Sequence, residues 1–284
     1  MDAEVQRSRA AGDFVPSTGN SKATVTNIRP FKLSIVVPVY NEVETVETVI
    51  RSILELKLPC DFEILVIDDG STDGSAQILE SLHEPKVKAF HHETNSGKGA
   101  AVQTGLAAAT GTHLLVFDAD TEYDPHDIAR LVRPLMSGRA EVVFGSRMHG
   151  FGTVHPSLHH LIGNRAMTWA TNIIFGAAMS DLHTCLKLIP VPLLQAMKLQ
   201  ENGFGLDTEI AAEMLRFGFR PYEMPISYVG RSVQEGKKIR FADAFRSIYV
   251  LLKVRLTRRR VKYGNRDMSL VPKTRVVEPG SQKT

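Results

Sequence analysis

Apolar runs rich in β-branched residues alternate with segments of helical periodicity along the first half of the chain. The alternation runs 33–37 then 43–56, 63–67 then 75–82, 87–90 then 99–109, and 114–117 then 125–136, and ends with a run at 141–144. This order predicts an α/β fold with a mostly parallel, Rossmann-like sheet and helices on both faces. Because right-handed crossovers place the strand-to-helix turns at one edge of such a sheet, we expect the functional site there.

The turn after the run at 114–117 is acidic. Asp118, Asp120 and Glu122 follow the run at alternate positions. Since side chains two apart on a strand share a face, Asp118 and Asp120 can present two carboxylates to one Mg²⁺ or Mn²⁺ ion. Glu122 would be a third ligand or a water-mediated contact. The spacing alone fits an acidic loop with a turn at Asp124 and Pro125 equally well.

Three earlier turns have a composition that suits phosphate or nucleoside binding. They occupy residues 38–42, 68–73 and 94–99, and each opens a predicted helix whose first N–H groups have no partner within the helix. Each turn also has a purely structural explanation. Thr72 or Asp73 can cap a helix, glycines can supply tight turns, and the glycines around Lys98 lack the full spacing of a P-loop.

Length and cysteine content limit the class of protein. A chain of 284 residues with 43% hydrophobic content fits one α/β domain, and its two cysteines, Cys60 and Cys185, lie too far apart for a disulfide framework or a zinc site. Histidines at 155, 159 and 160 lack the spacing of a metal motif, so we interpret them as loop residues. Neither a signal peptide nor a run of 18 apolar residues is present. We therefore expect a cytoplasmic protein that does not span a membrane.

Composition divides the chain into four regions. We expect a disordered tail at 1–32, a catalytic domain at 33–239, an amphipathic basic helix at 240–262 and a second disordered tail at 263–284.

The predicted basic helix carries an apolar stripe. The stripe comprises Phe241, Phe245, Ile248, Leu252 and Leu256, widened by Ala244 and Leu251. Lys253, Arg255, Arg258, Arg259, Arg260 and Lys262 follow within ten residues that contain no acid. The helix could lie in a membrane interface with its arginines at anionic headgroups, or it could pack on the catalytic domain. Nucleic acid is a poorer partner, because no recognition module accompanies the basic residues.

Five motifs, in order along residues 37–147, resemble those of the family 2 glycosyltransferases, which have the GT-A fold. The motifs are VPVYNE at 37–42, DDGSTD at 68–73, GKGAA at 97–101, DADTEYDP at 118–125 and GSR at 145–147. Residues 181–187, 205–209 and 228–238 are similar to the branch that makes polyprenyl-phosphate (dolichyl-phosphate) hexoses. The resemblance covers about residues 33–257.

The resemblance implies roles on the donor side of the site. The residues that would hold the nucleoside are Pro38, Tyr40, Glu42 and Asp69. Lys98 and a metal ion at Asp118 and Asp120 would meet the diphosphate, where the cation stabilises the negative charge of the leaving group. Many synthases of this branch carry Gln where Glu122 stands, so metal binding by Glu122 is left open.

On the acceptor side, the resemblance places a phosphate between arginines. Arg147 and Arg165 stand where similar synthases bind the acceptor phosphate, and Arg231 and Lys237 are implied to assist. A phosphate monoester is already ionised near neutral pH and needs positioning more than a base. A hydroxyl acceptor would need a base, for which Asp207 or Glu209 is available, although both also suit a helix N-terminus.

The resemblance therefore implies an inverting, metal-dependent transfer of one hexose from a UDP- or GDP-sugar to a polyprenyl phosphate at the cytoplasmic membrane face, in cell-envelope glycan synthesis. A glycosyltransferase of the same fold with a soluble hydroxyl acceptor is the first alternative. A nucleotide-sugar-binding membrane adaptor without turnover is the second, and the intact Asp118 and Asp120 argue against it. The sequence does not identify the base, the sugar or the oligomeric state.

Overall fold

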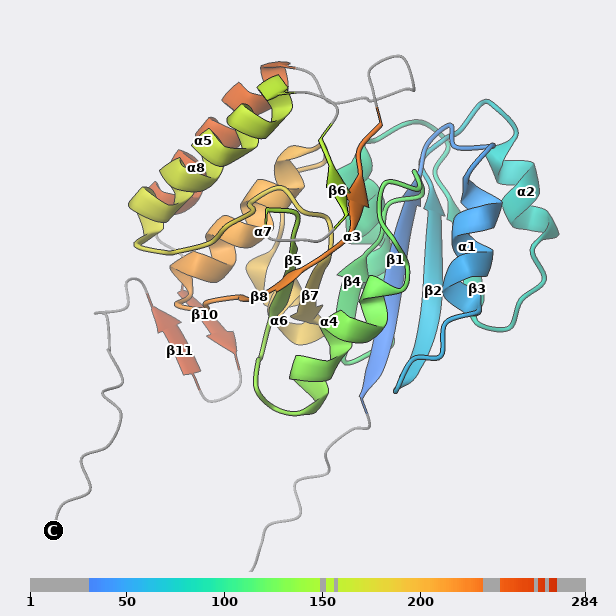
Figure 1. Ribbon diagram of the computed structural model, residues 1–284, viewed down its shortest axis with the longest axis horizontal. Helices are drawn as coiled ribbons and strands as arrows, with labels where there is room; N and C mark the ends of the chain where they lie inside the picture. Colours follow the sequence, from blue (N-terminus) through green and yellow to red (C-terminus); the bar gives the residue numbers. More distant parts are fainter. Residues whose placement is uncertain are drawn as a thin grey trace, which may run out of the picture.

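A seven-stranded sheet forms the centre of the molecule (Figure 1). The computed structural model describes residues 31–148, 152–155, 158–231, 241–257, 260–263 and 266–269. The strand order is β3-β2-β1-β4-β7-β5-β8. The strands are β1 (Lys32–Val39), β2 (Asp61–Asp68), β3 (Val87–His91), β4 (His113–Val116), β5 (Val143–Ser146), β7 (Lys187–Pro190) and β8 (Tyr222–Pro225).

The sheet is mostly parallel, as predicted. Strand β1 pairs in parallel with β2 and β4, β2 pairs with β3, and β5 pairs with β8. Strand β7 runs antiparallel to both of its neighbours, β4 and β5. The carboxyl ends of β1, β2 and β4 therefore meet at one edge, which is where the sequence places the site.

Helices cover both faces of the sheet (Figure 1). They are α1 (Val46–Leu54), α2 (Ser75–Ser81), α3 (Lys98–Ala108), α4 (Asp127–Met136), α5 (Leu158–Phe175), α6 (Val191–Met197), α7 (Gly205–Arg216) and α8 (Phe241–Leu256). Alternate residues of β1 enter different cores: Leu33 and Ile35 pack with α1 and α4, whereas Val36 packs with α3 and α7. Burial on both faces explains why the strands are continuous apolar runs rather than alternating ones.

A short two-stranded ribbon brings the end of the domain to the acidic turn. Strands β6 (Thr153–Val154) and β9 (Tyr228–Val229) pair in parallel, and Tyr228 also bridges Tyr123. Residues 228–231 are thereby held beside Glu122.

Helix α8 packs beside α5 and against α7, at the side of the molecule away from β1, β2 and β3 (Figure 1). Its inward face is formed by Ser247, Val250, Leu251 and Val254. The predicted stripe residues Phe245, Ile248, Leu252 and Leu256 are exposed instead. Of the predicted stripe, only Leu251 packs into the core, and the side chains of Phe241 to Asp243 lie outside the described set.

The predicted boundary of the basic helix differs from the structure. The helix ends at Leu256, and β10 (Arg260–Tyr263) pairs antiparallel with β11 (Arg266–Ser269), where the prediction has helix to 262 and a disordered tail from 263. Val261 and Tyr263 favour a strand, and residues 266–269 supply the partner that a strand needs. Of the predicted tails, 1–30 and 270–284 lie outside the described residues, and β1 already begins at Lys32.

Candidate active site

Lys98 and Asp118 form an ion pair at the carboxyl edge of the sheet. Asp118 follows β4, and Lys98 is the first residue of α3. The Lys98 Nζ lies 2.7 Å from Asp118 Oδ1 and 3.8 Å from Asp207 Oδ2. Burial opposes the charge on Lys98, but the carboxylates of Asp118 and Asp207 outweigh it and raise the Lys98 pKa. Two predicted donor-side residues, far apart in sequence, are thus in contact.

Asp120 is half-buried, and more negative than positive charge surrounds it. Its Oδ1 accepts the Glu122 N–H at 3.2 Å, and its Oδ2 lies 3.4 Å from Arg231 Nη2. Burial, together with the carboxylates of Asp118 and Glu122, raises the pKa of Asp120 to about 7. Two carboxylate groups with incomplete neutralisation suit a hard divalent cation. Within the described part of the chain, no group of three or more His, Cys, Asp and Glu side chains could hold a metal ion.

Glu122 has both carboxylate oxygens engaged by the β9 region. Its Oε2 accepts the Tyr228 hydroxyl at 2.8 Å, and its Oε1 accepts the Arg231 N–H at 2.6 Å. These bonds favour a role in holding β9 over direct coordination of a metal ion.

Arg231 lies with the donor-side carboxylates. Its two terminal nitrogens each donate to a Glu42 oxygen at 3.1 Å, and Nη2 also faces Asp120. The Arg231 Nε is buried and has no hydrogen-bond partner among the described residues. The sequence grouped Arg231 with the acceptor-phosphate residues, whereas its contacts here are to Glu42 and Asp120. The other assisting residue, Lys237, lies outside the described set.

The nucleoside residues occupy the ends of β1 and β2. Pro38 is half-buried near the end of β1, and Tyr40 and Glu42 follow it on the turn to α1. Asp69 is buried, and its oxygens accept the N–H groups of Ser96 at 3.0 Å and Gly97 at 2.7 Å. These contacts show that Asp69 shapes the turn before Lys98. A contact between Asp69 and a base stays a prediction.

Arg147 is half-buried and is held by an acid. Asp181 binds its Nε at 2.7 Å and its Nη2 at 2.8 Å, and Asn164 donates to the same carboxylate at 2.8 Å. The Arg147 guanidinium also lies 5.0 Å from the centre of the Tyr228 ring. Burial opposes ionisation of Asp181, but Arg147 overcomes it and holds the Asp181 pKa well below its usual range.

Arg165 is exposed on α5, close enough to Arg147 for both to act on one imidazole. Burial lowers the pKa of His155, and the charges of Arg147 and Arg165 lower it further. The charges of the two arginines that the sequence assigned to the acceptor phosphate thus both reach His155.

Neither candidate base is well suited to take a proton. Asp207 lies 2.8 Å from Lys187 Nζ, and although burial opposes it, Lys187 and Lys98 together lower the Asp207 pKa. Glu209 is buried, and its Oε2 accepts the N–H groups of Gln200 and Glu201 at 2.9 Å each. The ion-paired Asp207 is therefore a weak base, and the backbone N–H groups occupy an oxygen of Glu209.

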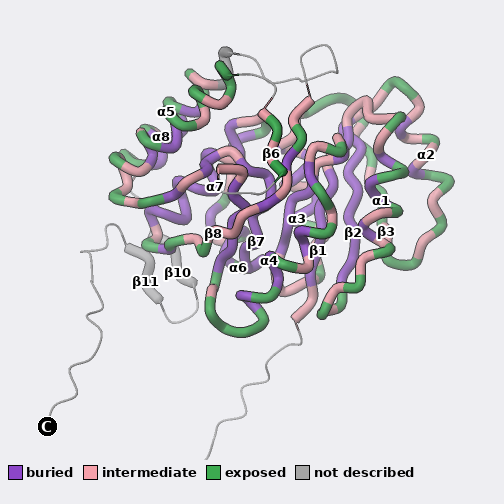
Figure 2. Tube along the Cα trace, in the orientation of Figure 1, coloured by how far each residue is buried: buried purple, intermediate pink, exposed green. Residues whose placement is uncertain are grey.

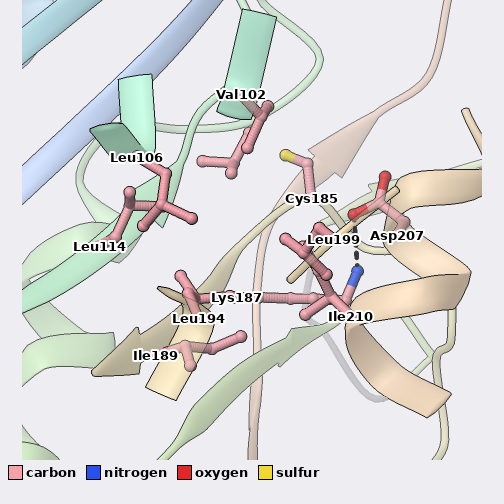
Figure 3. Close-up of a pocket in the computed structure, with 11 residues that line it drawn as sticks. Val102, Leu106, Leu114, Cys185, Lys187, Ile189, Leu194, Leu199, Asp207 and Ile210 are labelled. Carbon is pink, nitrogen blue, oxygen red and sulfur yellow. Dashed lines mark hydrogen bonds and ion pairs between the residues drawn. The ribbon is translucent and has the colours of Figure 1, made fainter. Parts of the chain in front are cut away.

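A small, mostly apolar pocket is lined by residues of α3, β4, β7 and α7. The Asp207–Lys187 pair lies at its polar end (Figure 3). Its volume is about 10 Å³, which is about the space of one water molecule. It cannot hold a nucleotide sugar.

Sequence reasoning gave no role to Asp181, Asn164 or His183. His183 lies between Asn164 Oδ1 and Thr208 Oγ1, at 3.1 Å from each, and burial lowers its pKa to about 4. It is therefore neutral near pH 7 and supports Asn164. The segment 181–187 is the sequence signal that pointed to Asp181 and His183, and Asn164 directly precedes the predicted Arg165.

The sequence profile of glycosyl transferase family 2 matches residues 34–190. Curated relatives include glycosyltransferases AglD and AglJ of Haloferax volcanii and the undecaprenyl-phosphate mannosyltransferase of Micrococcus luteus. AglD is 27% identical over 69% of this chain and 33% of its own length, and AglJ is 29% identical over 71% and 64%. The mannosyltransferase is 26% identical over 71% of this chain and 85% of its own length. This chain thus spans less than two thirds of the first two relatives.

Solved structures support the predicted fold. Glucosyl-3-phosphoglycerate synthase from Mycobacterium tuberculosis superposes with a TM-score of 0.60 at 21% identity, over 79% of this chain and 80% of the other. The predicted GT-A architecture is confirmed by this likeness together with the sheet order.

Proposed function

Because this chain belongs to glycosyl transferase family 2, we propose that it transfers a hexose from a nucleotide sugar to a polyprenyl phosphate at the cytoplasmic face of a membrane. The relatives leave two acceptor classes to distinguish. One curated relative is named an undecaprenyl-phosphate mannosyltransferase, which points to a lipid acceptor. The structural neighbour was crystallised with Mn²⁺, UDP and glucosyl-3-phosphoglycerate, which points to a small water-soluble acceptor.

On the donor side, Asp118 and Asp120 would hold a Mg²⁺ or Mn²⁺ ion. When bound, such an ion supplies Lewis-acid charge to the diphosphate leaving group. Lys98 adds a second positive charge beside Asp118, and the Nε of Arg231, which has no partner among the described residues, could donate to an anionic oxygen. These groups are fixed before the sugar–phosphate bond breaks, so they stabilise the developing charge without reorganisation.

On the acceptor side, the site favours a phosphate over a hydroxyl. A phosphate monoester is already nucleophilic near neutral pH, so it needs no proton acceptor. Arg147, held by Asp181, and the nearby Arg165 provide cations that can orient it. Asp207 has a lowered pKa beside Lys187 and Lys98, and Glu209 is occupied by backbone N–H groups, so neither is placed to serve a hydroxyl acceptor.

The observation that carries the lipid assignment is an exposed apolar face formed by α5 and α8, the α5–α8 face. Its side chains are Leu158, Ile162, Trp169 and Ile173 from α5 and Phe245, Ile248, Tyr249, Leu252 and Leu256 from α8, each at least 44% exposed. Figure 2 shows exposed segments along both helices, on the side away from the core. Soluble monomers rarely leave such a contiguous apolar surface uncovered.

The charge around this face favours an anionic bilayer over a second copy of the chain. Helix α5 contains no acid and carries His159, His160 and Arg165, and Arg258 to Arg260 follow α8. Two copies packed through this face would bring the basic side chains of α5 together. Anionic headgroups would complement them, and exposed Trp169 and Tyr249 are of the types enriched at the bilayer interface. None of the helices in the described residues is long and apolar enough to cross a bilayer.

A donor screen tests the proposal. Labelled UDP- and GDP-hexoses are incubated with the protein, Mg²⁺ or Mn²⁺, and either a short polyprenyl phosphate or 3-phosphoglycerate. We expect label in the organic phase with the lipid acceptor, and none with the soluble one. Label that remains in water on 3-phosphoglycerate would instead identify a soluble acceptor. Nucleotide binding without transfer to either acceptor would indicate a non-catalytic adaptor.

A further inference from the structure

Residues 200–203, here the 200–203 loop, lie against the N-terminus of α3. The Asn202 carbonyl accepts the Ala100 N–H at 3.1 Å, and Gln103 donates to the Glu201 carbonyl at 3.3 Å. A Cβ atom at Gly97 would collide with the Asn202 carbonyl, and one at Gly99 would collide with the Glu201 carbonyl. The glycines on either side of Lys98 therefore allow this close contact between the loop and α3.

The contact fixes the start of the helix that carries Lys98. Because Gly97 and Gly99 touch the loop directly, the backbone of Lys98 can move only if the loop moves with it. The Lys98 Nζ reaches Asp118 Oδ1 at 2.7 Å from this backbone position. The 200–203 loop thus helps to set the backbone position from which the ammonium group reaches Asp118.

Two helices hold the loop from different sides. From α7, Glu209 accepts the N–H groups of Gln200 and Glu201. From α8, Arg246 donates to the Glu201 carboxylate, with Nε 2.8 Å from Oε2 and Nη2 3.0 Å from Oε1. The Glu201 side chain is 3% exposed, so its charge depends on this partner, with Lys253 Nζ further away at 3.9 Å.

We propose that the Arg246–Glu201 pair links α8 to the donor side of the active site by positioning Lys98. Arg246 and Glu201 are positioning residues, since neither lies among the groups assigned to the donor or the acceptor. The identity of the ligand beside Lys98 rests on the proposed function. Helix α8 also carries part of the α5–α8 face. Attachment of that face to lipid and ligand binding at the donor site therefore influence each other through this pair.

A purely structural ion pair would behave differently. The Arg246 side chain is 55% exposed, but the Glu201 carboxylate that it binds is 3% exposed, so losing Arg246 lowers the unfolding temperature to some extent. A loss of global stability alone would speed exchange throughout the protein, whereas release of the loop speeds it first in the loop and at the start of α3, because Glu201 then needs water or Lys253 as its partner.

Amide hydrogen exchange on the full chain tests the link directly. Arg246→Gln should speed exchange in residues 97–103 and 200–203 by about fivefold or more, the lower end of typical coupling between sites. Arg246→Lys, which retains the charge, should restore part of the protection. Arg255→Gln is the matched control: Arg255 is an exposed base on the same helix and has no ion pair within the described residues, so exchange should match wild type.

Calorimetric titration with UDP and GDP, each with Mn²⁺, tests the consequence for the donor site. The nucleotide that binds wild type should bind Arg246→Gln with a Kd raised by a similar factor, and Arg255→Gln normally. Unchanged exchange in Arg246→Gln would overturn the link. Faster exchange with unchanged nucleotide affinity would overturn its role in positioning Lys98. If exchange is faster in Arg246→Gln but the wild-type protein binds neither nucleotide, the link stands and the proposed function is refuted.

Discussion

Asp181 binds the Arg147 guanidinium through both of its carboxylate oxygens, 2.7 Å from Nε and 2.8 Å from Nη2. This bidentate pair leaves Nη1, which lies 3.4 Å from the Tyr123 hydroxyl, as the nitrogen least committed to the protein. Arg147 is therefore oriented in advance, whereas Arg165 is exposed on α5. The two arginines of the proposed acceptor site should respond differently to the same substitution.

Replacing either arginine by lysine keeps the charge but removes the guanidinium fork. For Arg165→Lys we expect the acceptor KM to rise about tenfold with the donor KM and Tm unchanged. For Arg147→Lys we expect the same loss on the acceptor and also a lower unfolding free energy, by about 1–3 kcal/mol, because the buried Asp181 loses a donor. Steady-state kinetics with each substrate varied, with thermal unfolding in parallel, would measure both. A rise in donor KM instead would place these arginines on the nucleotide side.

The Arg147–Asp181 pair illustrates what the sequence could not give. The acidic turn at Asp118 and the turn before Lys98 were predictable, because a buried strand followed by a helix start is a local pattern, and parallel topology brings the strand ends together. Asp181 lies 34 residues after Arg147, on a segment without helical or strand periodicity. Only the folded chain shows that this acid holds that arginine.

Asp120→Asn should abolish transfer at every Mg²⁺ or Mn²⁺ concentration, and EDTA should reproduce the loss in wild type. The substitution should not weaken the fold. Asp120 lies half-buried beside Asp118 and Glu122, so a neutral amide relieves repulsion, and the Tm of the metal-free protein should stay equal or rise. Full activity of Asp120→Asn in EDTA would refute the metal assignment.

The Asp120→Asn variant also tests how the stability of the fold depends on pH. The pKa of Asp120 is raised from 3.8 to about 7, so between these values the folded protein binds a proton that the unfolded chain has lost. Asp120 therefore destabilises the fold progressively as the pH rises through this range. His113 and His183 act in the opposite direction, because burial lowers both pKa values from 6.5 to about 4 and acid then favours the unfolded chain.

Comparison of the variant with wild type removes the histidine contribution, which is common to both. The Tm advantage of Asp120→Asn should be small at pH 5 and larger at pH 8, with about 2–4 °C for each kcal/mol in a domain of this size. Thermal unfolding in EDTA across this range would measure it. An advantage that does not change with pH would show that Asp120 is not the titrating group.

Glu122 allows a test of coordination against positioning. In Glu122→Gln, the amide oxygen can accept the Arg231 N–H, and the Tyr228 hydroxyl can rotate to accept from the amide nitrogen. We expect this variant to keep the wild-type metal requirement and Tm. Glu122→Ala should lose about 1–3 kcal/mol of unfolding free energy, because two donors lose their acceptor. A much higher metal concentration for half-maximal activity in Glu122→Gln would show that Glu122 is a ligand.

The orientation of α8 also depended on tertiary structure. Its sequence is apolar on more than one face, with Phe245, Ile248 and Leu252 on one and Val250 and Val254 on another. Periodicity finds both faces but cannot rank them, because burial is decided by the surfaces of α5 and α7 on which the helix packs. The sequence left open whether the stripe packs or faces a membrane, and in the structure Phe245, Ile248, Leu252 and Leu256 are exposed while Leu251 packs inward.

The α5–α8 face predicts how activity depends on the form of the acceptor. An isoprenoid tail stays in the bilayer while its phosphate must reach Arg147 and Arg165, so the site has to lie near the headgroups. Apolar insertion and attraction to anionic lipid together give the two signals that stable attachment requires. Two variants separate these signals. The first combines Trp169→Ser with Phe245→Ser and removes exposed apolar side chains. The second, the arginine variant, replaces Arg258, Arg259 and Arg260 by Gln and removes charge.

Both variants should bind anionic vesicles less and transfer less sugar to vesicle-borne acceptor, yet act normally on a short, water-soluble polyprenyl phosphate. Wild-type binding should fall steeply with salt, and binding of the arginine variant should depend on salt less, because its charge contribution is gone. Met136→Ser is the matched control, since Met136 is 45% exposed but lies on α4. Vesicle sedimentation and assays with both acceptors would measure these effects. Equal losses on both acceptors would mean that these residues support the site itself, and unchanged vesicle binding would refute attachment through the α5–α8 face.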